Sequence, residues 1–395
     1  LSNTPSPTWC YMALAPHSQS SCSRWLVVDT DAGVDDAFAL CMALKLAKKN
    51  NLEFKLITCC FGNCSLQQVG INVAKCLAAC APCARPAIVL GAAGPLSTEK
   101  AEVHATHFHG SDGLGDATEA LSEELTNDLL GGMKNDGKAA AEALLELLYL
   151  AKKEGAEVTL VTLGPLTNLA LALQEDPELP LLLNELVVMG CCGNGRGNHG
   201  RVTEFNIHAD PEAASEVFAR SWTQLTVSSW DLTIFATVPW QYFDLLINEK
   251  TSNTEVGKFL GKISHLPYVQ KRSTNSCSRG EVSCWPSMAL MLLHCLEPIL
   301  KHLQPPQGVG LWHLSSIPGA IICDAITLAM VLRPEMILRS SHVHIEVELG
   351  GAITRGQTVV DWGTCFDGIH RPKHLRWVEE VDMNLFCRLL RDTVS

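Results

Sequence analysis

The sequence predicts an α/β fold built on an open, mostly parallel, doubly wound sheet with helices on both faces. Strand-like apolar runs alternate with helical patterns between residues 26 and 229, and such alternation is typical of parallel strands joined by helical crossovers. Polar side chains also gather where several of these runs end. Open α/β sheets bind their ligands at the carboxyl ends of the strands, so we expect the functional site at that edge.

The individual elements follow from short patterns. A helix over 69–81 is expected to begin at a capping box formed by Ser65 and Gln68, and Asp210 followed by Pro211 marks another helix start. The other expected helices cover 36–48, 138–153, 168–174 and 382–391. The expected strands are Leu26–Asp29, Phe54–Phe61, Ala87–Leu90, Val158–Leu163, Leu186–Met189, Leu225–Ser229, Val343–Leu349 and Val359–Trp362.

The chain has 395 residues, 47% of them hydrophobic, which is enough for a large core in one big domain or in two smaller ones. Residues 1–23 are rich in Ser, Pro and Cys and are predicted to be a disordered tail, followed by a single domain over 24–395. Residues 97–137 are expected to form a long loop region over the site. Residues 272–320 show no clear period, so we interpret them as an atypical insert or lid.

Charge and cysteine content restrict the class of protein. A formal net charge of −12 argues against binding to nucleic acid or to an anionic membrane. The sequence contains no unbroken apolar run long enough to span a bilayer, and the first residues lack the pattern of a secretory signal. The 17 cysteines, an odd number in a long chain, are best explained as reduced thiols, so we expect a cytoplasmic protein.

The first strand ends in an acidic loop. Four aspartates, Asp29, Asp31, Asp35 and Asp36, lie within it, just before a helical pattern begins. Their charges repel one another unless a hard cation lies among them, and oxygen-rich sites suit Ca²⁺ or Mg²⁺. The alternative is a solvated acidic turn at a helix N-terminus, where Asp is favoured.

Polar residues follow other strands too, so the same crevice should hold many carboxylates and amides. The positions are Asn63, Asn168, Asn198, Glu204, Asn206 and Asp231. Few lysines or arginines lie among them. Such a lining suits a cation together with a neutral polyol, and it suits a phosphate poorly.

These blocks together resemble the inosine–uridine-preferring nucleoside hydrolases. The segment Asp29-Thr30-Asp31-Ala32-Gly33-Val34-Asp35-Asp36-Ala37 is similar to their D-x-D-P-G-x-D-D-A signature. Further blocks match in the same order: Gly62-Asn63, residues 108–115, 163–168 and 204–214, and a late strand block over 347–361. The resemblance covers about residues 25–260 and 317–390, and it implies the family's fold, with the active site at the carboxyl ends of the strands.

The resemblance implies calcium-dependent hydrolysis of the N-glycosidic bond of ribonucleosides, giving free base and ribose. Asp31 would be a Ca²⁺ ligand and the general base for a calcium-bound water, and the other ligands would be Asp36, the main-chain carbonyl of Leu163, and Asp324. The ribose would be held by Asp35, Asn63, Asn198, Glu204 and Asn206, with Met189 packing near the sugar and His109 near the substrate. It further implies a role in nucleoside salvage and a homodimer or homotetramer.

Elementary chemistry agrees with that assignment. Departure of the base leaves an oxocarbenium-like ribosyl centre, and surrounding carboxylates stabilise positive charge. A bound metal ion lowers the pKa of its water. A carboxylate base beside that water contributes roughly 10²–10⁴-fold to the rate.

The sequence departs from the family pattern in three places. Ala32 replaces the usual Pro, which should loosen the loop mildly. Cys323 stands where well-known members carry the His that helps to protonate the leaving base, and a thiol is the poorer proton donor, with a reference pKa of about 8.5 against about 6.5. Some branches of the family resemble this chain in having Cys there. The segment before Cys323, which usually helps to cover the base, is the atypical one.

Other hypotheses stay open at this point. A catalytically impaired homologue would keep the nucleoside or ribose site but lose turnover through Cys323 and residues 272–320. A phosphatase of the haloacid-dehalogenase kind would use Asp29 as nucleophile, but it requires a phosphate-binding Lys and leaves residues 204–214 unexplained. The histidines at 104, 107 and 109 are not interpreted as a metal site, because a zinc site needs a fuller ligand set, and His109 is expected near the substrate. The pair Cys80 and Cys83 is interpreted as structural or incidental.

Overall fold

A nine-stranded sheet forms the centre of the protein in a computed structural model, which describes residues 22–97, 104–117, 137–248, 252–270, 319–363 and 375–395. The strand order is β10-β9-β11-β6-β5-β4-β1-β2-β3. All neighbours from β11 to β3 pair in parallel, whereas β9 pairs antiparallel with both β11 and β10. The predicted open, mostly parallel sheet is therefore confirmed.

The strands follow the predicted order, with small shifts at their ends. In the main sheet they are β1 (Arg24–Thr30), β2 (Glu53–Cys59), β3 (Ala87–Leu90), β4 (Glu157–Thr162), β5 (Glu185–Met189), β6 (Leu225–Ser228), β9 (Ile337–Val347), β10 (Thr358–Asp361) and β11 (Leu375–Val381). A separate antiparallel pair joins β7 (Val238–Pro239) to β8 (Gly319–Ala320). The sequence patterns missed β11, which joins the parallel strands to the antiparallel edge.

The helices fill the crossovers between the strands. The larger ones are α1 (Val34–Leu46), α2 (Leu66–Cys80), α5 (Ala139–Glu154), α6 (Thr167–Glu175), α8 (Pro211–Phe218), α10 (Trp240–Leu246), α11 (Glu255–Ile263), α15 (Cys323–Leu332) and α16 (Met383–Val394). The shorter turns are η1 (Lys48–Asn50), α3 (Thr106–His109), η2 (Leu179–Leu181), α7 (Phe205–Ala209), α9 (Trp230–Thr233), η5 (Pro334–Met336) and the π-helical η3 (His265–Gln270).

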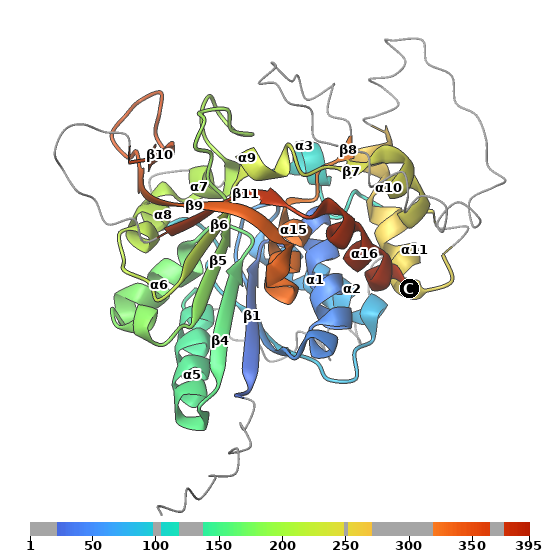
Figure 1. Ribbon diagram of the computed structural model, residues 1–395, viewed down its shortest axis with the longest axis horizontal. Helices are drawn as coiled ribbons and strands as arrows, with labels where there is room; N and C mark the ends of the chain where they lie inside the picture. The colour runs from blue at the N-terminus through green and yellow to red at the C-terminus, as the bar shows by residue number, and fades with distance from the viewer. Residues whose placement is uncertain (1–21, 98–103, 118–136, 249–251, 271–318, 364–374) are drawn as a thin grey trace, which may run out of the picture.

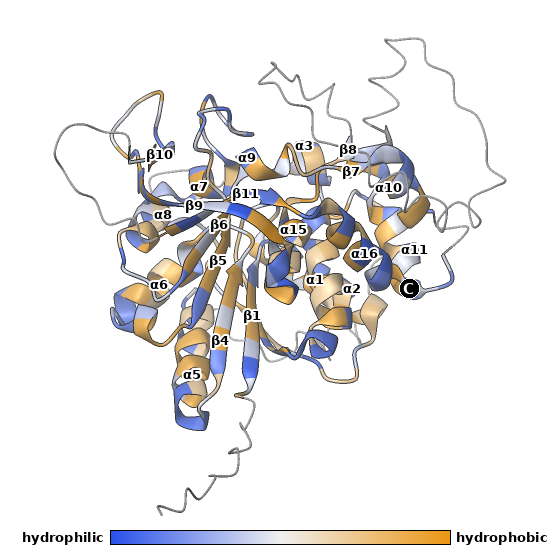
Figure 2. Ribbon diagram, viewed as in Figure 1, coloured by the Kyte–Doolittle hydropathy of each residue, from blue (hydrophilic) through white to orange (hydrophobic). Residues whose placement is uncertain are grey.

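Successive strand residues face opposite sides of the sheet, which gives the protein two cores. On β1, Leu26 and Val28 pack with α1, α2, α15 and α16, whereas Trp25 and Val27 pack with α5, α6 and α8. Helices therefore cover both faces, as predicted. Figure 2 shows the apolar colour along the middle strands and a hydrophilic end on α5. The carboxyl ends of the parallel strands lie at the upper edge of the sheet in Figure 1, near α3, α7 and α9.

Two predicted caps had different outcomes. Asp210 caps α8 by accepting from the N–H of Ala213 at 3.1 Å, as expected. The capping box at Ser65 is wrong: Ser65 is the N-cap of α2 but makes no side-chain cap bond. Gln68 instead donates to the side chain of Asn72, one turn further along the helix, at 3.0 Å.

Several predictions fall on residues outside the described ranges, namely the tail to residue 21, most of the loop over 97–137, and the insert at 272–320 apart from its last two residues, which form β8. Among the described helices, none is long and apolar enough to cross a membrane. The cysteines in the described ranges are free thiols, and most of them are buried, including Cys76 and Cys80 in α2.

Candidate active site

The acidic loop turns sharply from β1 into α1. Asp36 in the first turn of α1 accepts from the hydroxyl of Thr30 at 2.6 Å and from the N–H of Gly33 at 2.8 Å. The second bond satisfies one of the backbone donors that a helix start leaves free. Asn63, which follows β2, donates its side-chain amide to the same carboxylate at 3.1 Å. Asp36 is thus fixed by three donors before any ligand arrives.

Asp31 is completely buried at the end of β1. Its Oδ2 accepts from the backbone N–H of Asn63 at 2.7 Å. The neighbouring Gly62 has φ +157°, and a Cβ there would lie 2.1 Å from Oδ2, so only glycine lets this strand end approach the carboxylate. The other oxygen, Oδ1, is buried and has no hydrogen-bond partner among the described residues.

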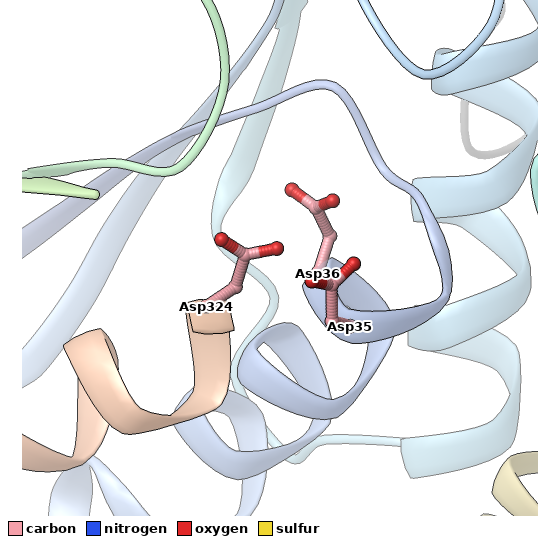
Figure 3. Close-up of side chains that lie close together, drawn as sticks. All are labelled: Asp35, Asp36 and Asp324. Atoms are coloured by element: carbon pink, nitrogen blue, oxygen red, sulfur yellow. The ribbon is translucent and has the colours of Figure 1, made fainter. Parts of the chain in front are cut away.

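Asp324 brings a third helix start to the same place. One carboxylate oxygen from each of Asp35, Asp36 and Asp324 lies within 4.8 Å of the other two. Figure 3 shows Asp324, on the first turn of α15, facing the two aspartates on the first turn of α1. Within the described part of the chain, this is the only group of three His, Cys, Asp or Glu side chains gathered so closely.

Burial and mutual repulsion raise the pKa values of these carboxylates and so disfavour their ionised forms. Burial first, and then the negative charge of Asp36, raise the pKa of Asp35 to about 7 and that of Asp31 well above its usual value. Burial also raises the pKa of Asp36, and burial and the charge of Asp35 raise that of Asp324. A cation among them would reverse the effect, because opposite charge favours the ionised form.

The donor set fits a hard divalent cation. It consists of carboxylate oxygens, and Asp31 and Asp35 each keep one buried oxygen without a hydrogen bond among the described residues. Buried polar atoms of this kind normally have partners, and oxygen ligands of this sort suit Ca²⁺. The carbonyl of Leu163, the predicted main-chain ligand, accepts from the side-chain amide of Asn206 at 2.7 Å.

A second group of predicted site residues comes from the segment after β5. Glu204 is the N-cap of α7 and accepts from the backbone N–H of Asn206, Ile207 and Cys191. Burial raises its pKa to about 7. Asn206 also lies against Met189, 3.3 Å from its sulfur. The structure therefore brings Glu204, Asn206, Met189 and Leu163 together.

Asn198 differs from these residues because it is exposed, and its side-chain oxygen accepts from the N–H of Phe205 at 2.8 Å. It holds the loop onto the start of α7.

His109 and Cys323 approach the acidic loop from two further elements. Nδ1 of the buried His109 accepts from the N–H of Val34 at 3.0 Å, which leaves that nitrogen without a proton. Its 3.9 Å separation from Asp35 is therefore not an ion pair through this atom. Cys323 begins α15 and donates to the hydroxyl of Thr233 at 3.6 Å. Burial, with the charge of Asp35, raises the pKa of its thiol, so it stays protonated.

Asp29 shares with Asp31 and Asp35 a buried Oδ1 that has no hydrogen bond among the described residues, but its other oxygen is bonded to two neighbouring elements. Its Oδ2 accepts from Thr58 on β2 at 2.5 Å and from Asn168 on α6 at 2.8 Å. Burial raises its pKa to about 6. A buried carboxylate bonded to two neighbouring elements is a structural tie, and this argues against Asp29 as a phosphatase nucleophile.

Two residues near the site were missed. Tyr268 is buried, its hydroxyl donates to the carbonyl of Ile321 at 2.8 Å, and burial and the charges of Asp35 and Cys323 raise its pKa. No period or motif marks it. Asn72 was also missed, although an Asn inside the apolar run of α2 is a usable signal, because Asn is a poor helix former.

Comparison with known proteins decides the family. Residues 26–388 match the model of the inosine-uridine preferring nucleoside hydrolases. The chain belongs to this family. As a family member it is a hydrolase acting on N-glycosidic bonds, a nucleoside N-ribohydrolase.

Relatives and solved structures agree over nearly the whole chain. An inosine-uridine preferring nucleoside hydrolase of Leishmania major is 30% identical over 94% of this chain and 98% of its own length. Uridine nucleosidase 1 of Arabidopsis thaliana is 35% identical over 86% of this chain and 82% of its own. A solved inosine-guanosine nucleoside hydrolase superimposes with a TM-score of 0.72 at 28% identity, covering 94% of this chain and 98% of its own.

Proposed function

We propose that this nucleoside hydrolase uses Ca²⁺ and the carboxylate of Asp31 to hydrolyse ribonucleosides to free base and ribose. The observation that carries the proposal is the convergence of Asp35, Asp36 and Asp324 beside Asp31, with buried oxygens of Asp31 and Asp35 left unpaired in the described part of the chain. A nucleoside hydrolase with this arrangement has both a binding site for a hard cation and an acceptor for a proton.

The residues that would hold Ca²⁺ are Asp31, Asp36, Asp324 and the carbonyl of Leu163. The unpaired oxygens and the raised pKa values of the carboxylates support this assignment. When bound, the ion would lower the pKa of the attacking water and hold it near the ribose hydroxyls. The carbonyl of Leu163 is already bonded to Asn206, whose amide would orient it.

Asp31 would act as the general base. Its Oδ2 is held by Asn63, so Oδ1 is the oxygen that takes a proton from water. The water oxygen bonds to C1′ of the ribose as the bond from C1′ to the base nitrogen breaks. The bonding electron pair leaves with the base, which then takes up a proton. Positive charge develops on the ribosyl centre, and nearby carboxylates stabilise it.

Ribose binding is assigned to Asp35, Asn63, Asn198, Glu204 and Asn206, with Met189 against the sugar and His109 at the substrate's edge. Glu204, Asn206 and Met189 support it because they are buried together next to Leu163. The relatives are named for inosine, uridine and guanosine, so the proposal extends to ribonucleosides as a class. A homodimer or homotetramer and a cytoplasmic location are part of the same proposal.

The test is free ribose released from inosine, guanosine, adenosine, uridine and cytidine, with and without a calcium-selective chelator. We expect release that the chelator stops and that added Ca²⁺ restores. Chelator-resistant release would contradict the role of the metal. If the protein binds nucleosides or ribose but releases no ribose from any substrate, the impaired-homologue hypothesis is correct, and Cys323 is the first residue to test.

A further inference from the structure

The residue after Asp31 has an unusual backbone conformation. Ala32 has φ +41°, in the left-handed region that residues with a side chain rarely adopt. Its N–H donates to the hydroxyl of Thr30 at 3.1 Å, and its carbonyl accepts from Nδ2 of Asn72 at 3.0 Å. These two bonds hold the backbone of Ala32, and its conformation sets the direction in which the chain leaves Asp31.

Asn72 is a buried polar residue in the middle of α2, with no exposed surface. Its amide nitrogen donates to the carbonyl of Ala32 and also to the carbonyl of Asp112, at 2.8 Å. Its oxygen accepts from Gln68. Asn disfavours a helix interior, and burying its amide is costly unless it is bonded. The bonds that offset this cost go to two loops outside the helix.

The second of these loops follows α3, whose last residue is His109, and we call this segment the His109 loop. Asp112 lies three residues after His109, and Gly113, with φ +74°, packs so closely that a Cβ there would lie 2.9 Å from Nδ2 of Asn72. His109 itself accepts from the N–H of Val34. The acidic loop and the His109 loop are therefore joined at two points, by His109 and by Asn72.

We propose that Asn72 is a positioning residue that fixes the acidic loop and the His109 loop against each other, and that it thereby orients the carboxylate of Asp31. This inference rests on the proposed function of Asp31 as calcium ligand and base. Asn72 touches neither the substrate nor the metal ligands' carboxylates in this scheme, and it acts through the carbonyls of Ala32 and Asp112.

The test compares Asn72→Asp with native protein and with Asn50→Asp. Asn72→Asp keeps the shape of the side chain but replaces both N–H donors with an oxygen facing two carbonyls. Asn50 lies just beyond the C-terminal end of α1 and donates to the carbonyl of Leu46, the last residue of that helix. Asn50→Asp therefore removes a similar side-chain to backbone bond at a place away from the site. A second variant, Gln68→Leu, removes the bond that orients the Asn72 amide and serves if Asn72→Asp does not fold.

Two measurements are made on the full chain: amide hydrogen exchange in peptides covering 26–38 and 105–117, and calorimetric titration with Ca²⁺. Asn72→Asp should speed exchange in both peptides and weaken Ca²⁺ binding by about tenfold, the lower end of the effect of losing an outer-shell partner, because Asn72 acts on Asp31 only through the neighbouring Ala32. Gln68→Leu should do the same more weakly, and Asn50→Asp should leave both peptides unchanged.

The outcomes separate the inference from the function on which it rests. Exchange in either peptide that stays at the native rate in both Asn72→Asp and Gln68→Leu overturns the role of Asn72. So does native Ca²⁺ affinity in a folded Asn72→Asp. If native protein binds no Ca²⁺, the proposed function fails, and the exchange data still decide whether Asn72 joins the two loops.

Discussion

The candidate site has two walls, one formed by α1 and α15 and the other by α7. Both carry buried carboxylates, but the oxygens of these carboxylates differ in their hydrogen bonding. On the α1 and α15 side, Asp31 and Asp35 keep buried oxygens without partners in the described residues. On the α7 side, the two oxygens of Glu204 accept hydrogen bonds from three backbone N–H groups. The first wall therefore leaves buried carboxylate oxygens unpaired, whereas the second is organised by its own backbone.

This difference shows that acidic content alone does not identify a metal site. Glu204 is as buried as Asp31, Asp36 and Asp324, and burial raises its pKa as well. What separates the two walls is that both oxygens of Glu204 accept from backbone N–H groups, whereas Oδ1 of Asp31 and Oδ1 of Asp35 have no hydrogen-bond partner among the described residues. The predictions below test that distinction.

The largest effect is expected at Asp31. Asp31→Ala should lower ribose release by about 10²–10⁴-fold, the contribution of a positioned general base. The fold should persist, because the variant removes a buried charge that repels Asp36. Steady-state kinetics on inosine, with circular dichroism as the folding check, measure this. Full activity in Asp31→Ala would mean that another group is the base.

Removing calcium should destabilise the protein. A ligand that binds only the folded state at about 100 times its Kd stabilises it by about 2.7 kcal/mol, so the melting temperature should fall by several degrees in chelator. Asp324→Asn is the matched control: it lacks one ligand, and its melting temperature should respond little to Ca²⁺. If the melting temperature of the native protein does not change with Ca²⁺, the α1 and α15 wall does not bind the ion, and the proposed difference between the walls is wrong.

Glu204→Gln should weaken the hydrogen bonding of the α7 wall and leave Ca²⁺ binding unchanged. A Gln amide offers one acceptor oxygen and places an NH₂ group against backbone donors, which costs about 1–3 kcal/mol for the groups left unpaired. Urea unfolding should show this loss, while the shift in melting temperature caused by Ca²⁺ should stay native. Loss of the Ca²⁺ response in Glu204→Gln would show that the two walls are coupled.

Without metal, stability should fall as the pH rises. The pKa of Asp35 is raised from 3.8 to about 7 in the folded protein, so the folded state binds more protons than the unfolded chain between these values. The unfolding free energy from urea titrations in chelator should therefore be higher at pH 5 than at pH 7, by about 2 kcal/mol. Asp35→Asn should flatten this slope, and Ca²⁺ should reverse it.

Sequence patterns predicted the parallel strands and the acidic loop because both are local. A buried strand is a short apolar run, and the four aspartates stand together in the chain. β11 was missed because its register shifts between Val378 and Glu380, which breaks the alternation on which strand prediction depends. The resemblance, not local spacing, supplied Asp324, which is far away in sequence. Asn72 was missed because its partners, Ala32 and Asp112, are set by tertiary contact.

The smallest effect is expected at Cys323, and it tests whether the α15 side also supplies a proton. The thiol donates only a 3.6 Å bond to Thr233, and burial keeps it protonated and weakly acidic. Cys323→His introduces a group of lower reference pKa, so release from inosine and guanosine should rise by about tenfold at most. Cys323→Ala is the control for volume. If Cys323→Ala matches native protein and Cys323→His is faster, the native enzyme leaves protonation of the base to water. If both variants are slower, the thiol itself assists departure of the base, and the α15 wall contributes both a metal ligand and a proton donor.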